Sequence, residues 1–395
     1  MKTKNHWLGA AVFLAAALLA NPAYAQFRTA RDPAVRAYLQ AHDEKVKAQK
    51  RAEREARRQD PHRRLRPYLT LEEIYDKMRE TAEAHPELCS LIEYGESVEG
   101  RPLLMMKIST GPDRPAILYS ANIHGNEMAG NMICLDLIDY FVEGYGVNRD
   151  TTYLLDRLDV YVIPVLNPDG MSRTASQQSD YGVVFSLTRK NANKVDLNRN
   201  YPYPEEALTR LRDTAGSSHK WSLNYRGPEP LSEPETQALD SLFAERGFLV
   251  HVNYHTTGGI ILSPPATLPE PLPDDDLHEA MRRDYQDAMF DPYVEHTELQ
   301  FYPTIGSLDD YIYHRYGALC ITLEVGKNAM RRALSGFHNG TWSPLFWGAN
   351  VYELGAEIAN NREGAVRMAW WALKIHEEPE LRKWRPREQK WAGEP

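Results

Sequence analysis

Residues 116–137 read AILYSANIHGNEMAGNMICLDL, and this stretch decides the fold. Its first part, 117–123, is a short apolar run between helix-breaking residues, which predicts a buried strand. Its later part, 128–141, has apolar residues at helical spacing and predicts a helix directly after the strand. A strand that leads through a short corner into a helix is the building unit of α/β folds.

The corner between strand and helix contains His-Gly-Asn-Glu, with His124 and Glu127 three residues apart. An imidazole and a carboxylate at such a corner can meet at one point, and together they supply two of the three protein ligands that a catalytic zinc ion needs. Alone, the pattern is weak because two-residue patterns recur by chance. A strand-end His followed by a Glu in the first helical turn is also an ordinary structural arrangement.

Strand patterns alternate with helix patterns along the rest of the chain. Strands are expected at 91–94, 103–108, 160–166, 248–254 and 318–323, and helices at 68–86, 233–246, 276–289 and 345–375. Asn-Pro-Asp-Gly at 167–170 predicts a turn. The alternation predicts an α/β fold with a central mixed, largely parallel sheet flanked by helices. With no internal repeat and no second core, one catalytic domain is expected at 67–376, followed by a C-terminal tail at 377–395.

The N-terminal segment predicts export. Lys2 and Lys4 precede an apolar run at 7–20, and Ala-Tyr-Ala at 23–25 places small residues at the positions that a signal peptidase recognises. We therefore expect residues 1–25 to be a cleavable signal peptide. The mature protein would be periplasmic or secreted, without a stable membrane span. An uncleaved N-terminal anchor is the alternative.

Charge is divided unevenly along the chain. Residues 27–66 contain thirteen Arg or Lys against six Asp or Glu, although the whole chain carries a net charge of −9. The segment 26–66 is therefore a basic helical arm, and the body is acidic. A solvated helix, or a helix folded back on the acidic body, is one interpretation. The other is an arm that contacts an anionic surface such as lipid head groups or cell-wall polymer. Nucleic acid is not an expected partner of an exported protein with an acidic body.

Three cysteines, Cys89, Cys134 and Cys320, lie far apart, and none has the spacing of metal ligands. An odd count permits at most one disulfide, so the chain is not a disulfide scaffold. Buried small apolar side chains are the expected role.

Three strand patterns end in residue types that bind zinc or work beside it, namely His124, His255 and Glu324. Ligands of such sheets collect at the carboxyl ends of the strands. With Glu127, two His and one Glu leave the fourth zinc position for water, whose pKa the ion lowers toward about 7. Glu324 is then placed to accept a proton from this water as general base. A nearby guanidinium would stabilise the negative charge on the attacked carbonyl.

In order and spacing, these residues resemble the zinc carboxypeptidases that include pancreatic carboxypeptidases A and B. The shared motifs, spread over 68–326, are Gly100-Arg101-Pro102, His124-Gly125-Asn126-Glu127, Asn167-Pro168-Asp169-Gly170, Asp196-Leu197-Asn198-Arg199-Asn200, His255, and Tyr302 with Glu324. The resemblance implies a zinc exopeptidase with one Zn²⁺ per chain. Its substrates would be peptides with a free C-terminus, from which it removes single residues.

The resemblance also implies the metal ligands and the general base. His124, Glu127 and His255 match the zinc ligands, and Glu127 can bind through both carboxylate oxygens. Asp196 matches the carboxylate that orients His124. Glu324 matches the general base.

Other matches concern the substrate bond and its upstream side. Arg189 resembles the Arg that polarises the scissile carbonyl, while Arg173 and Arg226 lie in loops that compete for this role. Asn126 departs from the pancreatic enzymes, which have an Arg that contacts the residue upstream of the cut, so preferences on that side are expected to differ. No inhibitory pro-domain fits in 26–66, and synthesis as an active enzyme is expected.

The remaining matches concern the C-terminal residue of the substrate. Asn198 and Arg199 match the pair that grips the terminal carboxylate, a bidentate task that suits Arg, and Tyr302 matches the tyrosine that swings over it. Asp309 aligns with the base of the side-chain pocket and would favour a C-terminal Lys or Arg. A shift of register to Asp310 is the alternative. Broad or apolar specificity, or a cell-wall peptide ending in diaminopimelate, stays open.

Two other functions stay open. An amidohydrolase or deacylase of the same fold would act on small acylated amino acids or cell-wall peptides. Such an enzyme does not need to bind a peptide terminus. Asn198, Arg199 and Tyr302, which match residues that bind and cover the terminus, therefore argue against it. The third possibility is a catalytically silent module that binds peptide or glycan. The presence of Glu324 and all three ligands argues against this module.

Overall fold

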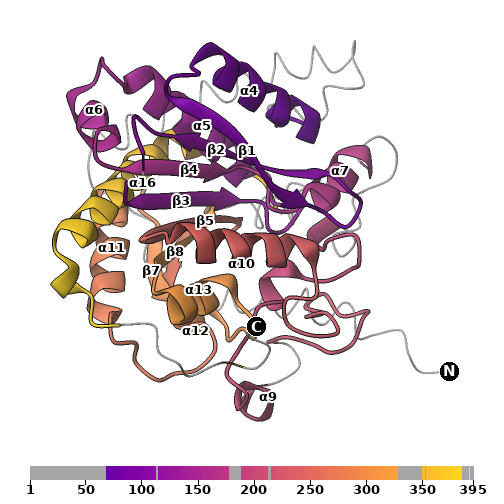
Figure 1. Cartoon of the computed structure of the whole chain (residues 1–395). Coiled ribbons are helices and arrows are strands. Elements are labelled where there is room, and N and C mark those ends of the chain that lie inside the picture. The colour runs from indigo at the N-terminus through magenta and orange to yellow at the C-terminus, as the bar shows by residue number, and fades with distance from the viewer. Residues whose placement is uncertain are drawn as a thin grey trace. The chain divides into compact units, whose positions relative to one another are not determined.

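The strand, corner and helix predicted around His124 form β3 (Ala116–Ala121) and α5 (Ala129–Gly144) in a computed structural model of the chain (Figure 1). The structure describes residues 68–112, 114–177, 188–211, 215–327, 349–351, 353–384 and 391. The predicted signal peptide and basic arm lie outside the described residues.

Eight strands of the described chain form one mixed sheet in the order β1-β2-β4-β3-β5-β8-β6-β7. The other strands are β1 (Cys89–Glu96), β2 (Pro102–Ile108), β4 (Asp159–Ile163), β5 (Val250–Thr256), β6 (Ile260–Ser263), β7 (Val294–Thr297) and β8 (Leu319–Val325). Pairs β3·β4, β3·β5, β5·β8 and β6·β7 are parallel, and β1·β2, β2·β4 and β6·β8 are antiparallel. The predicted mixed sheet is confirmed, and its central strands are parallel.

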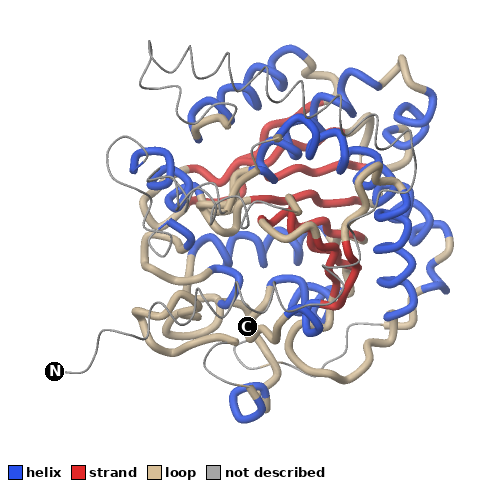
Figure 2. Tube along the Cα trace, turned by 180° about the vertical axis from the view of Figure 1, so that it is seen from behind, coloured by secondary structure: helices blue, strands red, loops and turns tan. Residues whose placement is uncertain are grey.

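Helices cover both faces of this sheet. They are α4 (Leu71–Ala84), α6 (Arg149–Leu155), α7 (Pro168–Gln177), α9 (Ala207–Arg210), α10 (Pro234–Arg246), α11 (Asp275–Asp287), α12 (Glu298–Phe301), α13 (Leu308–Tyr316) and α16 (Leu354–Glu377), with 3-10 turns η2 (Leu197–Arg199) and η3 (Pro379–Leu381). In Figure 1, α10 lies in front of the sheet, whereas α5 and α16 lie behind it. Figure 2 shows the opposite face, with the strands as a continuous layer between the helices.

Alternation along β5 separates an apolar face from a polar one, because successive side chains of a strand point to opposite sides. Tyr254 points to the side of α11, where its hydroxyl lies 3.4 Å from that of Tyr285. His251 points to the other side and contacts the ring of Phe243 in α10. His255 shares the parity of His251, so the polar face of β5 is the one covered by α10 and α13.

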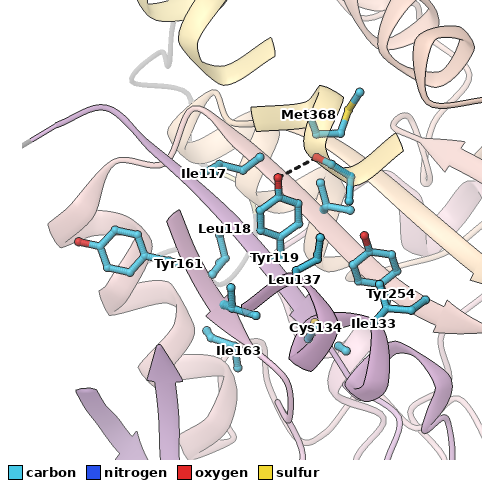
Figure 3. Close-up of a cluster of buried hydrophobic side chains, with 14 of the residues drawn as sticks. Ile117, Leu118, Tyr119, Ile133, Cys134, Leu137, Tyr161, Ile163, Tyr254 and Met368 are labelled. Atoms are coloured by element: carbon cyan, nitrogen blue, oxygen red, sulfur yellow. Dashed lines mark hydrogen bonds between the residues drawn. The ribbon is translucent and has the colours of Figure 1, made fainter. Parts of the chain in front are cut away.

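The apolar face holds the core around β3, whose six residues are all buried. Figure 3 shows Tyr119 of β3 among Ile117, Leu137 and Met368, and its hydroxyl donates a 2.8 Å hydrogen bond to the Ala365 carbonyl of α16. Burying an apolar side chain of this size stabilises a fold by about 1.5–3 kcal/mol. Because its polar tip has a partner, Tyr119 adds this stability without leaving a buried polar atom unpaired.

The Asn-Pro-Asp-Gly segment, predicted as a turn, is instead the start of α7. Asn167 caps this helix, because its Oδ1 accepts a 2.9 Å hydrogen bond from the Gly170 amide. Pro168 occupies the first helical position, where its missing N–H leaves no bond unmade. Asn, Pro, Asp and Gly serve both turns and helix starts, so the local sequence does not separate the two.

The start of α7 supports the corner that contains His124. A Cβ atom added at Gly125 would lie 2.2 Å from the carbonyl carbon of Gly170, so only glycine allows this close approach. Asp169 accepts hydrogen bonds from the Ser97 hydroxyl at 2.8 Å and from Arg101 Nη1 at 2.6 Å. These bonds tie the β1–β2 hairpin to the same corner.

The C-terminal part of the described chain continues past α16. The backbone amide of Trp384 donates to Asp274 Oδ2 at 3.1 Å, which fastens the residues after η3 to the start of α11.

Cys89, Cys134 and Cys320 are buried and form no disulfide. No helix in the described part of the chain is both long enough and apolar enough to cross a membrane.

Candidate metal and substrate site

The corner after β3 is shaped by Asn122, which adopts a left-handed backbone conformation with φ 62°. Asn tolerates this region better than most residues. Its side-chain amide donates to the carbonyl of His124 at 3.1 Å and to that of Glu127 at 2.8 Å. These two bonds close the corner and hold both residues toward one point.

Three potential ligand atoms meet at this point. His124 Nδ1 lies 3.0 Å from Glu127 Oε1, and His255 Nδ1 lies 3.1 Å from Glu127 Oε2. The two Nδ1 atoms are 3.2 Å apart. All three residues are buried, and their ligand atoms lie within 4.8 Å of one another. The structure therefore brings together the three residues predicted as zinc ligands, two from the corner after β3 and one from β5.

The hydrogen bonds around His124 show which of its nitrogens faces the other two residues. Nε2 lies 3.1 Å from Asp196 Oδ1, and a carboxylate can only accept, so Nε2 carries a hydrogen. Nδ1, which faces Glu127 and His255, is then the nitrogen whose lone pair can bind a metal ion. Two imidazole nitrogens and a carboxylate are the donor set of catalytic zinc sites, so these residues fit a zinc ion.

Asp196 holds His124 in this orientation and is itself held by Arg189. Arg189 Nε and Nη2 donate to Asp196 Oδ2 at 3.1 and 3.0 Å. Although burial opposes it, the charges of Arg189, His124 and Arg199 keep the pKa of Asp196 well below its usual value. Asp196 is thus a charged acceptor that fixes the His124 tautomer.

Arg189 lies beside the three ligand residues, with Nη1 3.4 Å from Glu127 Oε1. The two competing arginines are bound elsewhere: Arg173 donates to Glu99 and Asn191, and Arg226 donates to the Gly216 carbonyl at 3.1 Å. The contacts of Arg189 with Asp196 and Glu127 therefore place this candidate at the site.

Glu324 is positioned by sheet register. It is the partner of His255 across the parallel pair β5·β8, so both side chains leave the same face of the sheet. Glu324 is buried at 9% exposure. Burial, reinforced by the charge of Glu127, raises its pKa well above the usual value against the opposing charges of Arg189 and Arg199.

A cavity opens beside His255, one of the three ligand residues. It is lined by Asn198, Arg199, His255, Leu262, Glu298, Phe301, Tyr302, Thr304, Thr322 and Glu324. The cavity therefore joins the predicted general base to the predicted carboxylate-binding and covering residues.

Arg199 supplies the guanidinium among the residues that line this cavity. It is 2% exposed, its Nη1 donates to the Asn198 carbonyl at 2.7 Å, and its Nε has no hydrogen-bond partner among the described residues. Its guanidinium carbon lies 5.8 Å from the centre of the Tyr302 ring. Asn198 is anchored through its Oδ1, which accepts a 2.9 Å bond from the Leu308 amide.

Asp309, predicted at the base of the side-chain pocket, is not among the residues that line the cavity. Its Oδ1 lies 3.1 Å from His251 Nδ1, and its Oδ2 accepts from the Thr322 hydroxyl. His251 in turn lies 2.7 Å from Ser120 Oγ through Nε2. Asp309 therefore belongs to a buried hydrogen-bonded chain, and the carboxylates among the lining residues of the cavity are Glu298 and Glu324.

The alternative, Asp310, is also engaged by the protein. Its two oxygens accept 2.8 Å hydrogen bonds from the amides of Ala266 and Thr267. Burial raises its pKa to about 6. Asp310 therefore shapes the loop after β6 and does not line the cavity.

Two residues of the site were missed from the sequence. Asn122 directly follows a strand, and an Asn at such a point is a signal for a left-handed corner. Glu298 stands four residues before Tyr302, in Thr297-Glu298-Leu299-Gln300, where Thr297 and Gln300 form a capping box that marks a helix start. The helix start was a detectable signal, but the inward direction of Glu298 was not.

Comparison with known proteins agrees with this geometry. A family model described as zinc carboxypeptidase matches residues 74–338. Carboxypeptidase A2 of Rattus norvegicus is 31% identical over 208 residues, which cover 50% of this chain and 46% of that protein. Carboxypeptidase A1 of Bos taurus is 32% identical over 210 residues, with 52% and 49% covered. The chain spans about half the length of the curated relatives it matches.

Solved structures share the fold. The structure of thrombin activatable fibrinolysis inhibitor matches with a TM-score of 0.62 at 23% identity, over 78% of this chain and 74% of that chain. Carboxypeptidase A from Helicoverpa armigera matches with a TM-score of 0.62 at 22% identity, over 86% and 81%. These likenesses confirm the predicted architecture. Since the family model matches 74–338 of the 395 residues, the chain belongs to the zinc carboxypeptidase family.

Proposed function

We propose that this protein is a metallocarboxypeptidase that hydrolyses the last peptide bond of peptides with a free C-terminal carboxylate. The observation that carries the proposal is the shared cavity of Glu324, Arg199 and His255, which places a base, an anion-binding group and a metal ligand around one space. The family membership supports the same reaction class.

His124, Glu127 and His255 would hold one Zn²⁺ through Nδ1, the carboxylate and Nδ1. When bound, the ion supplies a Lewis acid that polarises the scissile carbonyl and acidifies water. Asp196 keeps the donor lone pair of His124 directed to this point, through its 3.1 Å contact with Nε2.

Arg199 and Asn198 would bind the terminal carboxylate of the substrate. The unpartnered Nε of Arg199 lies in a buried wall, where an unpaired donor is costly and an anionic ligand would satisfy it. Tyr302 borders the same cavity and would cover the bound terminus. An amidated terminus lacks the charge that this pair recognises.

Glu324 would accept a proton from the attacking water and return it to the leaving nitrogen. The water oxygen then bonds to the carbonyl carbon, the C–N bond breaks, and the shortened peptide and one amino acid are released. Arg189, held by Asp196 beside the ligand residues, would stabilise the negative charge on the carbonyl oxygen. In these reaction steps, each transferred proton is carried by Glu324 or by water.

The test uses peptides that share one core and differ in the last residue, each as free acid and as amide. Loss of single C-terminal residues from the acids is expected, and a chelator should abolish it. Glu324→Gln should lower kcat by about 10²–10⁴-fold while zinc content stays equal. Internal cleavage, chelator-insensitive cleavage, or turnover confined to small acylated amino acids would overturn the proposal.

A further inference from the structure

Glu298 brings a third charged group into the cavity, and neither base catalysis nor the carboxylate grip uses it. It is the first residue of α12, directly after the capping residue Thr297. Only 8% of its surface is exposed, and it lines the cavity together with Arg199 and Glu324. Its side chain is thus directed inward from the end of β7.

One oxygen of Glu298 is bound by the protein and the other is not. Oε2 accepts a 3.0 Å hydrogen bond from the Ser307 hydroxyl, whereas Oε1 has no partner among the described residues. A buried carboxylate is costly unless it is paired and hydrogen-bonded. The unpartnered oxygen therefore marks a position where a ligand donor would be stabilising.

Two structural roles do not account for this arrangement. A helix dipole stabilises an acidic residue in the first turn, but a four-residue helix has only a small dipole. An exposed acidic side chain would interact with that dipole equally well. A counter-ion role for Arg199 would give an ion pair, yet the Oε1 atom is unpartnered and Oε2 is bonded to Ser307. Burial raises the pKa of this carboxyl well above its usual value, and the charges of Asp309 and Asp310 reinforce the shift against the attraction of Arg199.

The rest of the wall has the chemistry of a pocket for a long cationic side chain. Leu262 and Phe301 provide apolar surface that an alkyl stem can cover, while Thr304 and Thr322 are neutral. Arg199 supplies positive charge for the terminal carboxylate, and Glu298 supplies a carboxyl group in the same cavity that a bound cation would hold in its charged form. A C-terminal residue with a cationic side chain presents a negative carboxylate to Arg199 and a positive group to Glu298.

Resting on the proposed function, we propose that Glu298 determines specificity for a C-terminal residue whose side chain ends in a cation, such as Lys or Arg. Its Oε1 accepts a hydrogen bond from the ammonium or guanidinium while Arg199 holds the terminal carboxylate. Asp309 and Asp310 do not perform this role, because their oxygens are bound by the protein itself.

The kinetic test compares peptides ending in Lys, Arg and norleucine, since norleucine resembles Lys in its stem but lacks the ammonium. The wild-type chain should favour Lys and Arg. Glu298→Gln should lower the Lys-to-norleucine ratio of kcat/KM on the order of 100-fold, with zinc content equal to that of the wild type. Asp309→Asn is the matched control and should change both substrates by the same factor.

A binding test separates this inference from the proposed reaction. Free lysine should bind the zinc-loaded full chain more tightly than free norleucine by calorimetry, and Glu298→Gln should abolish that difference. If no peptide is hydrolysed but the difference appears and depends on Glu298, the reaction fails and the specificity site stands. Equal binding of lysine and norleucine, or a preference that follows Asp309 instead, would overturn the inference.

Discussion

His124 and Asp196 are joined by a buried contact of 3.1 Å between Nε2 and Oδ1. Arg189 binds the other oxygen of Asp196, so the imidazole, the carboxylate and the guanidinium form one connected group. This group fixes a hydrogen on Nε2 of His124 and leaves Nδ1 facing Glu127 and His255.

Asp196→Asn should weaken zinc binding by about 10- to 100-fold. The Asn side chain carries no negative charge, and its amide does not require His124 to carry a hydrogen on Nε2. Competition with a chromophoric chelator measures the affinity. Asp159→Asn is a suitable control, since it removes an equally buried carboxylate that binds Arg246 away from the ligands. Equal zinc affinities in wild type and Asp196→Asn would contradict this role.

Zinc should raise the melting temperature of the chain after treatment with a chelator, because a ligand that binds only the folded state stabilises it. At a free zinc concentration of about 100 times Kd the gain is about 2.7 kcal/mol. His255→Ala should lose most of this gain, whereas His251→Ala, on the same strand but bound to Asp309, should keep a zinc response. Thermal scans with and without zinc provide the comparison. An undiminished zinc response in His255→Ala would remove it from the ligand set.

Arg199→Ala should selectively weaken substrates with a free C-terminal carboxylate, by about 100-fold in kcat/KM, because a buried charge contact is lost. The ratio between free-acid and amidated peptides should therefore collapse. Arg199→Lys should restore part of this ratio, because Lys supplies a positive charge but cannot bind a carboxylate in the bidentate geometry of Arg. Parallel losses on acid and amide would show that Arg199 acts on the fold and not on the terminus.

Glu235 should make stability depend on pH. Burial raises its pKa to about 7, so the folded state binds a proton more tightly than the unfolded state and stability falls as pH rises from about 4.5 to 7. Glu235→Gln should remove up to about 3 kcal/mol of this decline. Urea unfolding at pH 5 and pH 8 measures the change in stability of the wild type and of Glu235→Gln. Glu80→Gln, at an exposed position, is the control. A decline of equal size in Glu235→Gln would refute the assignment.

Gly130→Ala should destabilise the fold by about 1–3 kcal/mol through overpacking. An added Cβ would lie 2.6 Å from Tyr254 Cβ and 2.9 Å from Ala121 Cβ, where α5 crosses β3 and β5. Gly355→Ala near the start of α16 meets no atom within 4 Å and should be neutral or stabilising. Chemical denaturation of both variants distinguishes them, and equal stability would show that α5 can move away from the sheet.

Much of the site could be predicted because strand ends are visible in the sequence. His124, His255 and Glu324 each follow or close an apolar run, and parallel strands place such ends along one edge. The parity of β5 also separates His251 and His255 from Tyr254, a pattern present in Val-His-Val-Asn-Tyr-His. The turn expected at 167–170 was wrong because Asn167 and Pro168 suit a helix start equally well.

The sequence by itself indicated six of the eight described strands, the family, and the residues that meet at the sheet edge, since periodicity and motif spacing are local properties. Only the tertiary structure decided which carboxylate enters the cavity. Asp309 and Glu298 lie on different short helices, α13 and α12, and their directions depend on partners distant in the chain. His251 and Thr322 hold Asp309 in the interior, whereas Glu298 keeps one oxygen unpaired in the cavity wall.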